Sequence, residues 1–122
     1  MRTFWIEEGN DSPYVILDES KKLVEITGNS TLKEAHWFYS NLLKWMIAFN
    51  SGINRTETVN IKLNRINDSS AKWITLIFGR FIKLFPNTPL EINWEIRSKN
   101  ARVKEVALVF KNQIGYRVNM SA

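Results

Sequence analysis

The sequence predicts an α/β fold in which a mixed β-sheet is covered by helices mainly on one face. Segments in which apolar and polar residues alternate, as in a strand, take turns with segments whose apolar residues recur every three or four positions. The alternating segments have one polar side, whereas a sheet with helices on both faces would need strands that are apolar throughout. A length of 122 residues with 44% hydrophobic content fits one domain over residues 1–122.

The expected strands come first. Segments with the length and composition of strands are 4–8, 14–17, 23–27, 58–66, 90–96 and 116–120. The polar stretch 18–21 between the second and third of these predicts a hairpin turn. The two longest segments alternate strictly, so each is expected to have one buried and one wet face.

Three helices are expected, at 31–50, 69–85 and 101–112. The first opens with Thr31-Leu-Lys-Glu34, a capping-box pattern in which the two outer side chains satisfy free N–H groups. Leu76, Ile77 and Leu84 widen the stripe of the second helix, which is therefore expected to be the more buried one. The three apolar stripes are Ala35, Phe38, Leu42, Trp45 and Phe49; Ala71, Ile74, Phe78, Phe81 and Phe85; and Val103, Val106, Ala107 and Phe110.

The composition argues against an enzyme. The absence of cysteine excludes disulfides, iron–sulfur clusters, thiolate zinc sites and cysteine nucleophiles. The single histidine, His36, would have to serve any Ser-His-Asp set, and we interpret it as a partly exposed helix residue. We therefore expect no catalytic residues, no metal ligands and no cofactor.

Membrane insertion is not expected either. The longest apolar stretch, 73–85, is interrupted by Arg80 and Lys83 and is too short to span a bilayer. The N-terminus shows no apolar signal segment, so a cytoplasmic location is expected.

The positive charge lies in the second half of the chain. The first 61 residues carry 6 basic and 8 acidic side chains, whereas the other 61 carry 11 basic and 4 acidic ones. Such asymmetry is typical of proteins that bind nucleic acid, an anionic membrane or an acidic protein. Because the nearby aromatic residues fit the helix stripes, a scattered, solvated basic surface is the simplest interpretation. A docking patch for a protein is the next choice, ahead of nucleic acid.

The segment Asn67-Asp68-Ser69-Ser70-Ala71-Lys72 lies where an expected strand ends and the second helix begins. Aspartate and serine are preferred helix N-caps, so a structural cap is the simpler interpretation. A helix N-terminus also attracts anions, and a serine hydroxyl there is open to phosphorylation. A phosphate would add about −1.5 to −2 charges beside Asp68 and would switch off a surface that binds an acidic partner.

Three blocks of the chain resemble the SiaC family of bacterial regulatory phosphoproteins. Residues 26–45 are similar to the family's I-x-G-x-S … E-x-x-x-F-Y … W segment, residues 67–72 to its N-T-S-S-x-K, and residues 92–94 to its V-x-W strand. The resemblance implies a STAS-like, non-enzymatic partner-switching protein that a dedicated Ser/Thr kinase phosphorylates and a PP2C-type phosphatase dephosphorylates. It further implies that the unphosphorylated form activates a diguanylate cyclase and promotes cyclic-di-GMP signalling and biofilm formation.

One departure from the family concerns the phosphorylation site. The family's acceptor is the threonine of N-T-S-S, and this sequence has Asp68 there, which an ordinary Ser/Thr kinase cannot phosphorylate. The acceptor is then Ser69 or Ser70, since the stretch is similar to the D-S-S of STAS antagonists, whose first serine is phosphorylated. Alternatively, Asp68 is a permanent negative charge and partner binding is constitutive.

A second departure concerns the partner surface. The family usually carries an acidic run after the tryptophan strand, whereas residues 96–102 here are Ile-Arg-Ser-Lys-Asn-Ala-Arg. The local charge is reversed, which changes the expected docking surface. Asn67 and Lys72 are the expected partner contacts, and a basic nucleic-acid-binding domain is a less favoured alternative.

Overall fold

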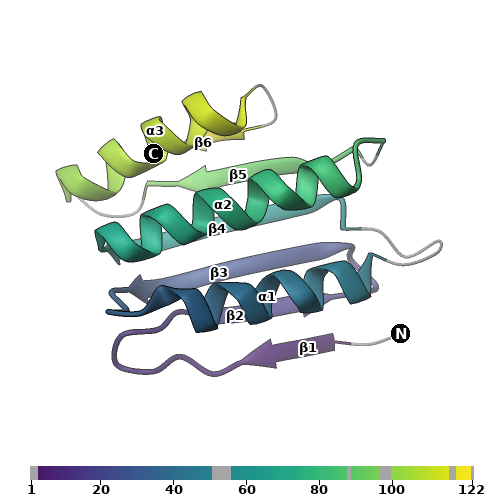
Figure 1. The fold of residues 1–122 in the computed structure, drawn as a ribbon, viewed down its shortest axis with the longest axis horizontal. Coiled ribbons are helices and arrows are strands. Elements are labelled where there is room, and N and C mark those ends of the chain that lie inside the picture. Colours follow the sequence, from purple (N-terminus) through teal and green to yellow (C-terminus); the bar gives the residue numbers. More distant parts are fainter. Residues whose placement is uncertain (1–2, 51–55, 88, 97–99, 116–117, 122) are drawn as a thin grey trace.

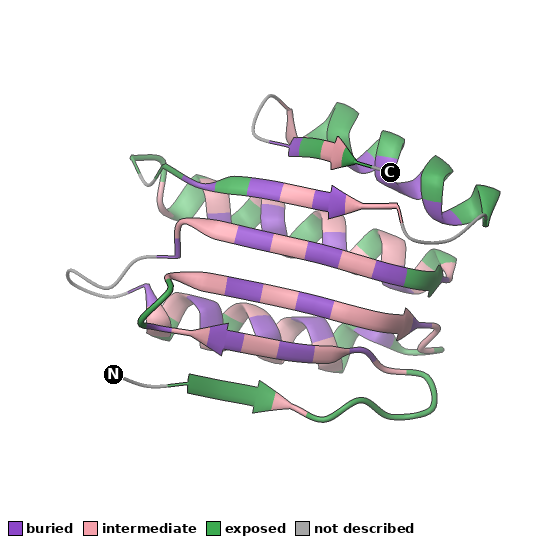
Figure 2. Ribbon diagram, turned by 180° about the vertical axis from the view of Figure 1, so that it is seen from behind, coloured by how far each residue is buried: buried purple, intermediate pink, exposed green. Residues whose placement is uncertain are grey.

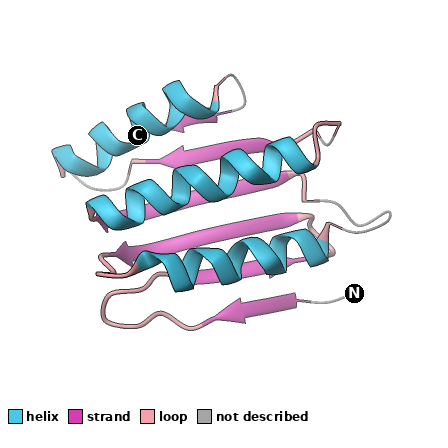
Figure 3. Ribbon diagram, in the orientation of Figure 1, coloured by secondary structure: helices cyan, strands magenta, loops and turns pink. Residues whose placement is uncertain are grey.

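The computed structural model describes residues 3–50, 56–87, 89–96, 100–115 and 118–121. Within them the chain forms six strands and three helices (Figures 1 and 3). The strands are β1 (Thr3–Ile6), β2 (Tyr14–Asp18), β3 (Leu23–Ser30), β4 (Thr58–Ile66), β5 (Glu91–Glu95) and β6 (Val118–Ser121). The helices are α1 (Ala35–Phe49), α2 (Asp68–Leu84) and α3 (Ala101–Ile114).

The strands form one mixed sheet in the order β1-β2-β3-β4-β5-β6. β1, β2 and β3 are antiparallel neighbours, as the expected hairpin requires, whereas β3, β4, β5 and β6 run parallel. Each parallel pair is joined through a helix, and such crossovers share one hand. All three helices therefore cover the same face of the sheet, which confirms the one-sided arrangement (Figure 1).

The core lies between this face and the helices. Figure 2, seen from behind, shows buried and half-buried residues alternating along the central strands. Within the described part of the chain, no helix is long and apolar enough to cross a membrane. The buried strand residues are Val15, Leu17, Val24, Ile26, Val59, Ile61, Leu63, Ile66, Ile92, Trp94 and Val118.

The uncovered face of the sheet carries a hydrogen-bonded row of amide side chains. Asn93 Nδ2 donates to Asn60 Oδ1 at 3.2 Å, and Asn119 Nδ2 donates to Asn93 Oδ1 at 3.2 Å. Asn119 Nδ2 also donates to Glu91 Oε1 at 2.9 Å. The polar residues predicted for this side of the strands thus bond to one another across β4, β5 and β6.

The terminal strands differ slightly from expectation. The first strand is Thr3–Ile6 rather than 4–8, and it pairs with β2 at the edge of the sheet. The last strand is Val118–Ser121, and the expected start of this strand at Tyr116 lies outside the described residues.

The first helix begins later than its capping-box pattern predicts, and that prediction is wrong. Glu34 is the N-cap of α1, and its side chain makes no capping hydrogen bond. Thr31 is instead bonded to the loop before β2, because its N–H donates to the Asp11 carbonyl at 2.8 Å and its hydroxyl donates to Asp11 Oδ1 at 3.4 Å. The Thr31 hydroxyl, which the local pattern assigns to the helix cap, is thus engaged in a tertiary contact with Asp11.

The buried stripe of α1 is also shifted. Ala35, Tyr39, Leu42 and Met46 are fully buried, whereas the predicted Phe38 and Trp45 are half-buried. Both series fit a spacing of three and four, so periodicity alone does not choose between them. Trp45 lies at the side of the helix, where its ring packs 4.7 Å from that of Phe4 in β1.

The other two stripes are largely as expected. Ile74, Ile77, Phe78 and Phe81 of α2 are buried, but Leu76 and Leu84 are 39% and 57% exposed, so their predicted burial is wrong. These two leucines lie on the outward side of a helix whose inner side is already filled. The α3 stripe is confirmed, with Val103, Val106, Ala107 and Phe110 all buried.

A bulge sets the end of β4. Gly28 pairs with Leu63 and Asn29 with Arg65, which leaves Asn64 as an extra residue. Gly28 has φ +112°, a backbone conformation that residues other than glycine rarely adopt. The bulge allows Leu63 and Ile66 both to face the helices, and it places the next residue, Asn67, beside the end of β3.

Candidate functional site

The three helices begin at one edge of the sheet. β3, β4 and β5 run parallel, and each leads into the helix that follows it. Figure 1 shows the first turns of α1, α2 and α3 side by side at the carboxyl ends of these strands. The segment 67–72 occupies the middle of this edge, where parallel α/β sheets commonly bind ligands.

Asn67 joins two of the connecting loops. Its Oδ1 accepts from the Ser70 N–H at 2.9 Å, which makes it the N-cap of α2. Its Nδ2 donates to the Leu32 carbonyl at 2.7 Å, and its backbone N–H donates to the Ser30 carbonyl at 3.0 Å. Both polar atoms of this expected partner contact are therefore bonded inside the protein.

Ser69 and Ser70 have very different surroundings. The Ser69 side chain is half-buried, and its hydroxyl accepts a hydrogen bond from the Ala35 N–H at 3.3 Å. This bond caps α1 from α2. Ser70 is fully buried, and its hydroxyl has no hydrogen-bond partner among the described residues.

Asp68 is the exposed residue of this first turn, with 88% of its side chain accessible. Its carboxylate forms an ion pair with the guanidinium of Arg102, in the first turn of α3. Arg102 also lies 3.6 Å from Glu105, one turn further along α3. The Asp68–Arg102 contact joins residues 34 positions apart, so strand and helix patterns in the sequence gave no sign of it.

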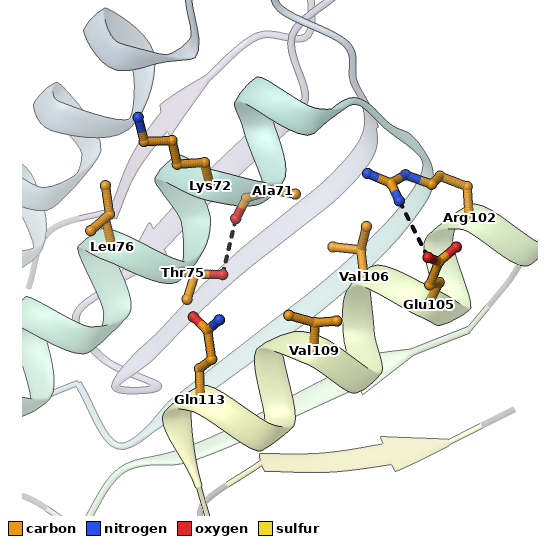
Figure 4. A pocket seen from close by; sticks show the side chains of 9 residues that line it. All are labelled: Ala71, Lys72, Thr75, Leu76, Arg102, Glu105, Val106, Val109 and Gln113. Atoms are coloured by element: carbon orange, nitrogen blue, oxygen red, sulfur yellow. Dashed lines mark hydrogen bonds and ion pairs between the residues drawn. The ribbon is translucent and has the colours of Figure 1, made fainter.

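Lys72 lies beside a groove between α2 and α3 (Figure 4). The groove has a volume of about 370 Å³, and Arg102 and Glu105 lie on its α3 wall. The Thr75 hydroxyl does not contribute a free donor, because it donates to the Ala71 carbonyl at 2.9 Å. The apolar part of the lining is made by Ala71, Leu76, Val106 and Val109.

A buried pair of hydroxyl groups, from Ser30 and Tyr39, lies in the core beneath the site. The hydroxyl oxygens of Ser30 and Tyr39 are 2.6 Å apart, and both residues are fully buried. Burial raises the pKa of Tyr39, although its hydrogen bond with Ser30 acts in the opposite direction. Because the Ser30 carbonyl accepts from Asn67, the first two blocks of the family resemblance meet here. Sequence reasoning singled out both blocks but did not show that they touch.

The third block has a structural role. Trp94 is fully buried, and its ring packs edge-on against Phe110 of α3, with 5.1 Å between the centroids. The aromatic residues Phe78, Phe81 and Phe110 are buried too, so they are not available to stack on nucleic-acid bases. His36 is exposed on α1, and the described residues contain no cluster of three acidic or histidine side chains that could hold a metal.

Comparison with known proteins agrees with this architecture. The sequence profile described as SiaC family regulatory phosphoprotein matches residues 6–122. Apo-SiaC from Pseudomonas aeruginosa superimposes with a TM-score of 0.80 at 18% identity over 100% of both chains. The SiaC chain solved in complex with the diguanylate cyclase SiaD, from the same organism, gives 0.82 at 20% identity over 98% of both. No curated protein matches the chain significantly in sequence.

At this level of identity, the structural matches establish a SiaC-like α/β fold. The profile match covers nearly the whole chain and agrees with the resemblance carried by the three sequence blocks. It describes regulatory proteins, which confirms the expectation that this protein is not an enzyme. The chain therefore belongs to the SiaC family of regulatory phosphoproteins.

Proposed function

We propose that this protein is a phosphorylation-controlled switch that binds a diguanylate cyclase in its unphosphorylated form. Support comes from its family and from a relative of the same fold that was solved in complex with the cyclase SiaD, of which it is the activator. In the cytoplasm, a dedicated Ser/Thr kinase would add the phosphate and a PP2C-type phosphatase would remove it. The output would be cyclic-di-GMP signalling and biofilm formation.

We propose Ser69 as the acceptor. Ser69 is half-buried at the first turn of α2, whereas the Ser70 hydroxyl is fully buried and could meet a kinase only after local unfolding. The observation that carries this choice is the hydrogen bond from the Ala35 N–H to the Ser69 oxygen. A phosphate on that oxygen would change the start of α1 and of α2 at the same time.

The phosphate would also change the charge of the helix edge. It would lie next to Asp68, whose carboxylate forms an ion pair with Arg102. The phosphate dianion would compete with Asp68 for the Arg102 guanidinium, because a guanidinium forms strong charge-assisted hydrogen bonds to phosphate. The surface that an acidic partner meets would then be more negative than in the unphosphorylated protein. Lys72, which is exposed on the same helix, remains a proposed partner contact.

Mass spectrometry tests the acceptor. The protein is isolated from its host with phosphatase inhibitors, and the phosphorylated residue is located by fragmentation. We expect one phosphate on Ser69, none in Ser69→Ala, and an unchanged amount in Ser70→Ala. Phosphate on Ser70 alone, or none at all together with unchanged partner binding of Ser69→Ala, would contradict the proposal.

The constitutive alternative rests on a different observation. Asp68 places a permanent charge at the α2 N-terminus, exposed and paired with Arg102. If this charge replaces the phosphate, binding of the cyclase by the wild-type protein is independent of phosphorylation. The variant Asp68→Thr restores the acceptor of the family motif, and partner binding by this variant should become dependent on phosphorylation. Equal dependence in wild type and variant would exclude the alternative.

A further inference from the structure

A second groove lies on the other side of α2, between α1 and α2, where Figure 1 shows the two helices side by side. It has a volume of about 430 Å³. Its apolar residues are Leu43 and Ile47 from α1 and Leu76 and Ile77 from α2, and Lys44 and Arg80 contribute the charged side chains. None of the described residues that line it is acidic.

An aromatic cluster occupies the end of this groove nearest the helix N-termini. Trp37 is 69% exposed, which is costly for so large an apolar side chain. The ring of His36 lies 4.7 Å from that of Trp73 and 6.1 Å from that of Trp37, measured between centroids. Tryptophan is strongly enriched among the residues that dominate protein–protein binding energy, so an exposed one beside a groove marks a contact surface.

The charge of this groove is uncompensated, unlike that of the groove between α2 and α3. There, Arg102 is paired with Asp68 and faces Glu105. In the groove between α1 and α2, Lys44 and Arg80 form no ion pair with any described residue. Across α1 and α2, the single acidic residue is Asp68, whose carboxylate is already engaged.

We propose that the groove between α1 and α2 docks an acidic amphipathic helix of a protein partner. Two parallel helices with an apolar floor between them offer the shape that receives the apolar face of a third helix. Acidic residues on the flanks of that helix would pair with Lys44 and Arg80. Nucleic acid fits less well, because the floor is aliphatic and offers no stack for bases beyond the tryptophan end.

Ser69 lies close to the aromatic end of this groove, as two neighbouring residues show. Trp73 follows Ser69 by one helical turn, so the two side chains lie on the same side of α2, with roughly 5–6 Å between their Cβ atoms. Ala35, whose N–H bonds to Ser69, directly precedes His36. A phosphate at Ser69 would repel the acidic helix at the aromatic end of the groove. This last step rests on the proposed function, whereas docking itself does not.

A peptide tests the docking. The probe is a fluorescein-labelled synthetic helix with leucine on one face and glutamate elsewhere, titrated with the full chain by fluorescence anisotropy at low salt. We expect Trp37→Ala and Arg80→Glu each to weaken binding about tenfold or more. The matched controls are Trp5→Ala, another exposed tryptophan, and Lys104→Glu, an exposed cation on α3, and both should bind as the wild type does.

The outcomes separate the two proposals. The docking proposal is overturned if the acidic peptide does not bind, if a lysine peptide of the same leucine pattern binds equally, or if the controls lose as much affinity as the groove variants. Tighter binding of a single-stranded oligonucleotide than of the peptide, lost with Arg80→Glu, would overturn it in favour of nucleic acid. Ser69→Asp should weaken peptide binding. If it does not, while the groove variants do, the phosphorylation switch is wrong and the docking site stands.

Discussion

The hydroxyl of Ser69 accepts a hydrogen bond from the backbone N–H of Ala35, so the first turn of α2 caps the first turn of α1. Helix N-termini leave their first N–H groups without intrahelical partners, and a residue of the same helix usually supplies the acceptor. Here the acceptor comes from another helix, 34 positions further along the chain. Ser69 thus belongs to α2 and caps α1. A chemical change of its hydroxyl would therefore affect the first turns of both helices.

Replacement of Ser69 by alanine should lower the free energy of unfolding by about 0.5–2 kcal/mol, the usual loss for an N-cap. Urea denaturation followed by circular dichroism measures the change. Ser70→Ala is the matched control, since it removes a buried hydroxyl without a described partner and should leave stability unchanged or slightly raised. A larger loss in Ser70→Ala than in Ser69→Ala would contradict the assigned hydrogen bonds.

Asn67→Ala should be more damaging, because it removes the cap of α2 and leaves the Leu32 carbonyl without its donor. We expect a loss of about 2–4 kcal/mol, the cap and the broken bond together. Asn67→Ser can still cap the helix but cannot reach Leu32, so its unfolding midpoint in urea should fall between those of wild type and Asn67→Ala. Equal midpoints for the serine and alanine variants would mean that the bond to Leu32 carries the whole effect.

The pair between Asp68 and Arg102 should contribute little to stability. Both side chains are substantially exposed, at 88% and 44%, and pairs of this kind are worth less than about 1 kcal/mol. A double-mutant cycle with Asp68→Asn and Arg102→Gln measures their coupling energy, which should vanish in high salt. A coupling well above 1 kcal/mol that persists in salt would show that the pair is part of the fold rather than of the surface.

The buried Tyr39 predicts a loss of stability in alkali. Its pKa is raised above the ordinary 10.0 by burial, so above about pH 10 the unfolded chain loses this proton while the folded chain keeps it. The unfolded state then binds fewer protons, and stability falls as pH rises; below that pH the group contributes no slope. Tyr39→Phe should show a shallower decline between pH 9.5 and 11 in urea titrations, when each variant is compared with its own value at pH 8. An unchanged slope would place the alkaline loss on other groups.

Much of the fold could be predicted because it follows from local alternation. The strict patterns in β4 and β5 indicated one wet face, and the one-sided helix layer followed from that. In α3, the spacing of Val103, Val106 and Phe110 was sufficient to identify the buried side, although Leu108 and Val109 are apolar and exposed. In α1, by contrast, most residues are apolar, so periodicity alone did not distinguish the series with Tyr39 from the series with Phe38.

The candidate site was found in sequence but its geometry was not. Residues 67–72 stood out because several cap formers occur together at a strand–helix junction. The capping box at Thr31 was misleading because Asp11, in a loop far away in sequence, binds the threonine instead. The contacts of Ser69 with Ala35 and of Asp68 with Arg102 depend on which helices become neighbours, and no local periodicity contains that information.

The common starting edge of the helices has one more consequence, which concerns the helix macrodipoles. Each helix N-terminus carries about half a positive charge, and a nearby anion gains roughly 0.3–1 kcal/mol from it. An anion on the Ser69 oxygen would lie in the fields of α1 and α2 together. The modified protein would then resist heat better than the unmodified one while binding its acidic partner less well. Thermal stability and partner affinity would move in opposite directions at a single oxygen atom.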